Sequence, residues 1–170
     1  MAADLSFDEL LSSAQHSAYH LEMRDGYMLD EDYTAWASGG GFNESDARWS
    51  SWKNLVSTTV SRGVEVHRAR IISEPISRYI RYEYELTSPL NVAAGEEVRW
   101  LPRRRASGIA LPGNDFWLID GVTLLINHFN GNGDMTGKEI VTDPDTVKLC
   151  ASAFATVWER ATPHEEYQPD

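Results

Sequence analysis

The chain reads RWSSWKNLVSTTVSRGVEVHRARII over residues 48–72. Apolar residues recur at helical spacing in the first half of this stretch, and a run rich in β-branched residues follows Gly63. The pattern predicts an amphipathic helix over 48–62, ended by Gly63, and a strand over 64–72. A helix, a glycine and a β-branched strand in this order predict an α/β fold whose sheet contains parallel strands.

Similar patterns continue on both sides of this unit. We expect further helices over 7–14, from Ser73-Glu74-Pro75 to Pro89, and after Asp143. We expect further strands over 18–25, 97–101, 116–120, 122–129 and 137–141. Asp120-Gly121 predicts a tight turn between two of these strands. Together the elements predict a mixed sheet flanked by helices.

Two segments fall outside these patterns. Residues 26–47 are acidic and rich in turn-forming residues, so we expect a mobile loop there, with a short helix near Tyr33 and Trp36. Residues 164–170 are acidic and follow a proline, which predicts a disordered tail. The remainder, residues 1–163, is expected to form a single α/β domain.

The composition is that of a soluble globular domain, since 42% of the 170 residues are hydrophobic and 24% are charged. The formal net charge of −11 opposes nonspecific nucleic-acid binding, because phosphates repel an acidic surface. The single cysteine, Cys150, excludes an internal disulfide and a cysteine-based zinc site. No apolar run has transmembrane length and the first residues lack the basic start of a signal peptide, so we expect a cytoplasmic protein without membrane contact.

Metal and cofactor sites are not expected. Only His16 and His20 have the i, i+4 spacing that would put two imidazoles on one helix face, and the alternation around them favours a strand. The segment 130–134 alternates oxygen ligands with glycine, yet it lacks the closing glutamate of a calcium loop and is better interpreted as a hairpin turn. The sequence therefore predicts neither a metal nor another cofactor.

The most concentrated positive charge lies in EVRWLPRRR, residues 97–105, and the stretch LPGNDFWLID, residues 111–120, follows it. We expect these stretches to form two adjacent strands whose turns meet at one end of the sheet. Arginine binds carboxylates and phosphates bidentately, so this end predicts a site for an anionic ligand or an acidic protein partner. The predicted ligand-binding residues are Arg78, Arg81, Arg99, Arg103, Asn114, Asp115, Trp117 and Asp120.

Three alternatives remain open. The chain could be a small enzyme acting on a nucleotide or a biosynthetic intermediate, with Asp115 or His128 as the acid or base. It could be a protein–protein adaptor with an exposed patch of tryptophans. The arginines could also form a purely structural ladder of ion pairs with Glu65, Glu74, Glu83 and Glu97.

Four motifs carry a resemblance to a known family: IISEP (71–75), NVAAGE (91–96), VRWLPRR (98–104) and LPGNDFW (111–117). With them the chain resembles, over residues 5–167, an uncharacterised actinobacterial family, one of the numbered domains of unknown function common in Streptomyces. Its members resemble small proteins encoded beside helix-turn-helix regulators. The resemblance brings no activity, but it implies a helix-turn-helix regulator as a protein partner.

The order of the expected elements also resembles one half of the phospholipase D-like fold. The catalytic signature of that fold is His-x-Lys, followed after four residues by Asp. If Asp120 takes the Asp position, Gly113 and Asp115 stand at the His and Lys positions. Glycine cannot attack phosphorus and aspartate repels phosphate, so the resemblance implies a non-catalytic version of the fold. We therefore predict an accessory or regulatory binding module.

Overall fold

The computed structural model describes residues 5–41 and 47–170. Within this part of the chain, seven strands form one sheet in the order β6-β5-β4-β1-β2-β3-β7. The strands are β1 (Ser17–Glu22), β2 (Glu65–Ile72), β3 (Glu97–Pro102), β4 (Phe116–Ile119), β5 (Thr123–Phe129), β6 (Met135–Val141) and β7 (Thr162–Pro163).

The centre of the sheet is parallel and its flanks are antiparallel. β1 pairs with β2, and β2 with β3, in parallel, whereas β4, β5 and β6 add as antiparallel neighbours on the other side of β1. Parallel neighbours need crossover connections. These contain α2 (Glu31–Ala37), α3 (Ala47–Ser61), α4 (Arg78–Leu86) and the π-helix η1 (Thr87–Val92). The prediction of an α/β fold with a mixed sheet flanked by helices is confirmed.

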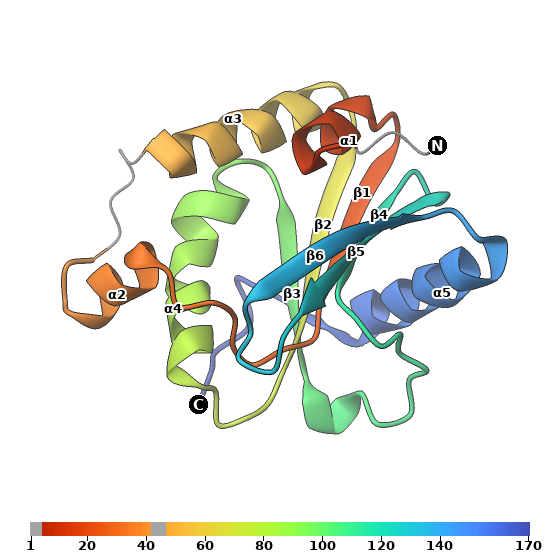
Figure 1. The fold of residues 1–170 in the computed structure, drawn as a ribbon. Coiled ribbons are helices and arrows are strands. Elements are labelled where there is room, and N and C mark those ends of the chain that lie inside the picture. Colours follow the sequence, from red (N-terminus) through yellow and green to blue (C-terminus); the bar gives the residue numbers. More distant parts are fainter. Residues whose placement is uncertain (1–4, 42–46) are drawn as a thin grey trace.

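Helices cover both faces of the sheet (Figure 1). α5 (Pro144–Arg160) lies on one face, where its apolar stripe packs against β1, β2 and β3. α1 (Phe7–Ser13) and α3 lie on the opposite face, and α4 continues this layer toward β3, with α2 beside it (Figure 1). Strand side chains alternate between these two layers, so each charged residue of a central strand has a defined face.

The turn at Asp120-Gly121 forms as predicted. Both residues have positive φ, 51° and 71°, which is the backbone of a tight hairpin turn between β4 and β5. The short helix expected near Tyr33 and Trp36 is also present as α2. Residues 42–46, near the C-terminal end of the predicted mobile loop, lie outside the described residues.

The boundaries of α4 differ from the prediction. The helix does not begin at Ser73-Glu74-Pro75, because the Ser77 hydroxyl accepts a hydrogen bond from Ile80 N (3.1 Å) and caps a helix that begins at Arg78. It also does not end at Pro89. The backbone continues through this proline as η1, whose wider turn accommodates a residue that lacks an N–H.

Two further expectations are wrong. The strands carrying RWLP and FWLI are not adjacent, since β1 and β2 lie between β3 and β4. The residues after Pro163 do not form a disordered tail either. His164 and Tyr167 are buried, the Trp100 indole donates to His164 Nδ1 (3.0 Å), and the Tyr167 ring stacks on Trp100. The aromatic contacts hold this segment against β3.

Among the described helices, none is long and apolar enough to cross a membrane.

Candidate functional site

Charged side chains lie on the sheet face beneath α3 and α4. Glu22 on β1 and Arg68 and Arg70 on β2 share this face because they occupy alternate positions of their strands. The parallel register places Glu22 beside Arg70 and His20 beside Arg68. All four residues are buried, so the charges of Glu22, Arg68 and Arg70 must be balanced within the protein.

Glu22 balances both arginines. Its carboxylate accepts a hydrogen bond from Arg68 Nη1 and another from Arg70 Nε (3.3 Å). Arg68 Nε donates in turn to Glu96, whose other oxygen accepts from Asn91 (2.8 Å). Burial by itself would raise the pKa of Glu22, but Arg70 and Arg68 hold it well below its usual range. Glu22 is therefore ionised. Because the positive charges of the two arginines are already compensated, they attract an anionic ligand only weakly.

Glu83 on α4 faces this network from above. Its Oε2 atom is buried, lies 3.7 Å from Arg70 Nε and has no hydrogen-bond partner. Burial raises the pKa of Glu83 to about 8, and Arg70 opposes this only in part. A carboxyl that keeps its proton near neutral pH inside a cleft is typical of a functional site.

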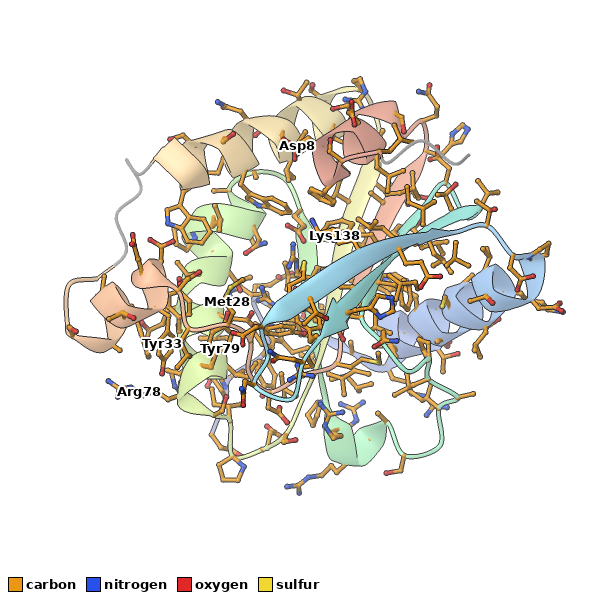
Figure 2. All side chains as sticks on the ribbon, viewed as in Figure 1. Asp8, Met28, Tyr33, Arg78, Tyr79 and Lys138 are labelled. Carbon is orange, nitrogen blue, oxygen red and sulfur yellow. The ribbon has the colours of Figure 1, made fainter. Side chains whose placement is uncertain are left out.

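Two cavities meet at Glu83, and we call them together the α4 cleft. The first, the α3 cavity, holds about 230 Å³ between α3, α4 and the sheet. The second, the β5 cavity, holds about 210 Å³ between α4 and the β5–β6 hairpin. Asp30, Tyr79 and Glu83 line both. Tyr79 and Met28, both labelled in Figure 2, line the β5 cavity.

The α4 cleft is lined by buried polar atoms that lack partners. Asn127 on β5 is 7% exposed, lines the β5 cavity, and its Oδ1 has no hydrogen-bond partner. Trp52 Nε1, on the wall of the α3 cavity, has none either. Such atoms are rare in native proteins, and each calls for an explanation.

Asp115 lies at the far wall of the β5 cavity and is 3% exposed. Its Oδ1 accepts from Met23 N (2.9 Å), and its Oδ2 accepts from the Tyr27 hydroxyl. Burial raises the pKa of Asp115, while the Tyr27 hydrogen bond opposes the rise. The same desolvation, together with Glu22 and Asp115, raises the pKa of Tyr27 well above its usual range, so Tyr27 stays a donor.

The structure brings only part of the predicted site together. Arg103, Asn114 and Asp115 line a third cavity of about 280 Å³ at the end of β4, which we call the β4 cavity. Asp115 thus lies between the β4 and β5 cavities. The Arg103 guanidinium donates to the carbonyl oxygens of Met23 and Ile71, so its main contacts are with the backbone.

The other predicted residues lie elsewhere. Asp120 is at the opposite end of the sheet, where its carboxylate accepts from backbone N–H groups of residues 15–17. Arg99 is on the α5 face, with its guanidinium 4.2 Å from the Trp158 ring centroid. Trp117 is buried beneath α1 and α3.

Arg78 and Arg81 on α4, and His128, the alternative acid or base predicted from the sequence, also lie outside the α4 cleft. Arg78 is exposed and donates to the carbonyl oxygen of Ala37 (2.8 Å), and Arg81 donates to that of Asp170 (3.1 Å). His128 is on the surface, where its Nε2 lies 3.0 Å from Glu139. None of these three side chains lines a described cavity.

Sequence reasoning missed most of the cleft. It did not single out Glu22, Glu96 or Asn127, and it named Glu83 only as a member of an ion-pair ladder. A signal was present in the strands themselves. Charged residues at alternate positions of a strand rich in apolar residues, such as Arg68 and Arg70, mark a buried polar face.

A family model described as a domain of unknown function, DUF6879, matches residues 5–169. The chain belongs to this family. The prediction of an uncharacterised domain family is thereby confirmed, while an actinobacterial origin for the DUF6879 chain stays a prediction. No curated protein matches the sequence.

Solved structures similar to the DUF6879 chain include Nuc from Salmonella typhimurium, a phospholipase D family member. It has a TM-score of 0.48 and 13% sequence identity, and the match covers 92% of this chain and 86% of that chain. Another is TrmBL2, an archaeal chromatin protein with a novel mode of DNA binding. Its TM-score is 0.47 at 14% identity, over 91% of this chain and 48% of that chain. At these scores neither likeness bears on function.

Proposed function

We propose that this chain is an accessory or regulatory binding module that takes a small ligand into the α4 cleft. The observation that carries the proposal is Asn127 Oδ1, a buried acceptor without a partner in a cavity wall. Leaving such a group unsatisfied costs about 1–3 kcal/mol. In a concave, largely apolar pocket, a ligand that donates a hydrogen bond to this acceptor recovers that free energy as binding affinity.

Glu83 supports the same assignment. Its buried Oε2 also lacks a hydrogen bond, and it lines the same cavity. Ring walls formed by Tyr27, Tyr79 and Phe129 complete the enclosure. Apolar walls with a small number of placed polar groups are the usual composition of small-molecule sites.

A fragment screen by ¹H–¹⁵N NMR tests the proposal. Mixtures of small neutral, cationic and anionic ring compounds are added to the wild-type protein and to an Asn127→Leu variant. We expect at least one compound to shift the backbone amides of Met28, Phe129 and Gly133, which line the β5 cavity, and to lose this effect in the variant. A screen in which every shift lies outside the cleft would contradict the proposal.

An anionic ligand, as the sequence predicts, is best placed in the β4 cavity. Arg24 and Arg103 line it, together with Asn114. Inorganic phosphate is the probe for this second candidate, and shifts confined to the amides of residues 111–114 would support it. A helix-turn-helix regulator as protein partner is a separate proposal, and recovery of such a regulator with the tagged chain from its native host would support it.

Acid–base catalysis in the cleft is the remaining alternative, favoured by the pKa of about 8 at Glu83. Asp115, the base proposed from sequence, is within the same cavity, whereas His128 is not among its lining residues. Turnover of any compound found in the screen, lost in Asp115→Asn and Glu83→Gln, would support an enzyme. Binding without turnover supports the module.

A further inference from the structure

The lining of the β5 cavity is acidic. Glu22, Asp30, Glu83 and Asp115 line it, and no lysine or arginine does. The charge of Glu22 is balanced by its ion pairs with Arg68 and Arg70. The other three carboxyl groups therefore determine the electrostatic potential of the cavity. In the part of the chain that the structure describes, Asp115 forms no ion pair, and its partners are a hydroxyl and a backbone N–H.

The walls of the β5 cavity are aromatic rings and thioethers. The Tyr27 ring meets Phe129 edge to face at 5.2 Å and Tyr79 at 6.0 Å. Met28 and Met135 complete the wall. Aromatic faces attract cations through the ring quadrupole, and Phe129 already shows this, since the Arg24 guanidinium lies 5.3 Å from its centroid.

The buried side-chain atoms of the cavity that lack a hydrogen-bond partner are oxygens, and both accept hydrogen bonds once Glu83 is ionised. Glu83 Oε2 and Asn127 Oδ1 are both buried without a donor. An ammonium group carries three donors and no acceptor, so it satisfies such atoms, whereas a carboxylate or a phosphate cannot. No set of three His, Cys, Asp or Glu residues in the described chain is arranged to hold a metal ion, so the geometry suits an organic cation better.

We infer that the β5 cavity binds the ammonium group of a small organic amine whose apolar part lies against Tyr27, Tyr79 and Phe129. This inference rests on the proposed function and names the ligand class. Arg68 and Arg70 do not repel such a ligand, because the carboxylates of Glu22 and Glu96 already balance their positive charges.

Binding of an amine should release a proton. Burial keeps Glu83 protonated near neutral pH, and a cation beside its carboxyl favours the ionised form. The proton leaves Glu83 for solvent as the ammonium enters, so affinity rises with pH through the pKa of about 8. His20, Asp30 and Asp115 also face this cavity, and Glu83→Gln separates the contribution of Glu83 from theirs.

Calorimetric titration of the full chain with three matched probes tests the inference. The probes are 2-phenylethylamine, 2-phenylethanol and 3-phenylpropionate, which share a ring and differ in charge. We expect the amine to bind at least about tenfold more tightly than the alcohol, and the acid not to bind. Titrations in two buffers of different ionisation enthalpy should show release of about one proton per amine at neutral pH.

Variants make the assignment specific. Glu83→Gln should abolish the proton release and weaken the amine about tenfold or more. Glu97→Gln, at a side chain 67% exposed on β3, should leave both unchanged. Nα-acetyl-lysine methylamide carries the ammonium group of a lysine side chain. If it binds more tightly than 2-phenylethylamine, the result would support the ammonium site and indicate that the natural ligand is a lysine of a protein partner.

The other outcomes separate this inference from the proposed function. Equal or tighter binding of the alcohol or the acid at the amides of the β5 cavity would overturn the ammonium assignment and leave the cleft as a ligand site. Absence of amine binding also overturns the assignment, and the fragment screen then decides the proposed function by itself. Amine binding with unchanged proton release in Glu83→Gln would remove Glu83 from the site.

Discussion

The Glu83 carboxyl lies 3.7 Å from the Arg70 guanidinium, yet no hydrogen bond joins them. Arg70 directs its donors elsewhere, with Nε bonded to Glu22 and Nη1 to the Thr87 hydroxyl (2.6 Å). Glu22 therefore takes most of the compensating charge. As a result, two glutamates around one arginine have opposite pKa shifts, with Glu22 held ionised and Glu83 protonated near neutral pH.

Replacement of Glu83 by glutamine should change how stability depends on pH. The folded pKa of about 8 lies above the ordinary value, so the folded state favours the protonated form. This contribution is fully present below the unfolded pKa of about 4.3 and is lost as the pH rises through about 8, by up to about 5 kcal/mol in total. Glutamine does not titrate, so the Glu83→Gln variant should keep its stability over this range.

Urea unfolding of both proteins at about pH 5 and about pH 9 measures this difference. The free energy of unfolding of the wild type should fall relative to that of Glu83→Gln as the pH rises. Parallel pH profiles would show that Glu83 has an ordinary pKa.

Glu22→Gln should strongly destabilise the protein. The change removes a carboxylate that bonds both Arg68 and Arg70, and it leaves buried charge uncompensated. Breaking a buried ion pair in this way costs about 3–5 kcal/mol. Chemical denaturation gives the value, and Glu97→Gln on the exposed surface should differ from wild type by no more than about 0.5 kcal/mol. A small effect of Glu22→Gln would mean that water reaches the network.

Asn127→Leu should stabilise the protein while it weakens binding in the β5 cavity. Leucine has a similar volume and removes a buried acceptor that has no partner, which should raise the free energy of unfolding by about 1 kcal/mol. Thermal and urea unfolding test the first effect and titration with 2-phenylethylamine the second. A loss of stability instead would show that Asn127 makes a structural hydrogen bond.

Asp120→Ala should affect stability and not ligand binding. The Asp120 carboxylate accepts hydrogen bonds from Gln15, His16 and Ser17, and it stands at positive φ where alanine is strained. We expect a loss of about 2 kcal/mol in urea unfolding, with the affinity of the β5 cavity unchanged. Weakened amine binding in a folded Asp120→Ala protein would instead return Asp120 to the site that the sequence suggested.

The sequence predicted local structure well where a single periodicity governed it. The helix before Gly63, the strand after it and the Asp120-Gly121 turn are all present. It failed where local signals competed with packing. Pro89 does not stop the helical backbone, because η1 carries it further, and the acidic end of the chain is held by aromatic contacts to Trp100.

The candidate site could be predicted only in fragments. Arg103, Asn114 and Asp115 do share a cavity, as expected from two turns at one end of the sheet. Asp120 and Arg99 do not join them, since one is at the opposite end and the other on the opposite face. A list of polar residues near two motifs cannot distinguish the ends and faces of a strand whose neighbours are unknown.

The sequence by itself determined the class of fold, the succession of helices and strands, and the alternation that puts Arg68 and Arg70 on one face of a strand. These follow from local backbone and hydrophobic preferences. Only the tertiary structure decided that β1 lies between β2 and β4, which brings Glu22 to the arginines and sets Glu83 above them. Strand order depends on pairing between distant segments, and burial then determines which carboxyl keeps its proton.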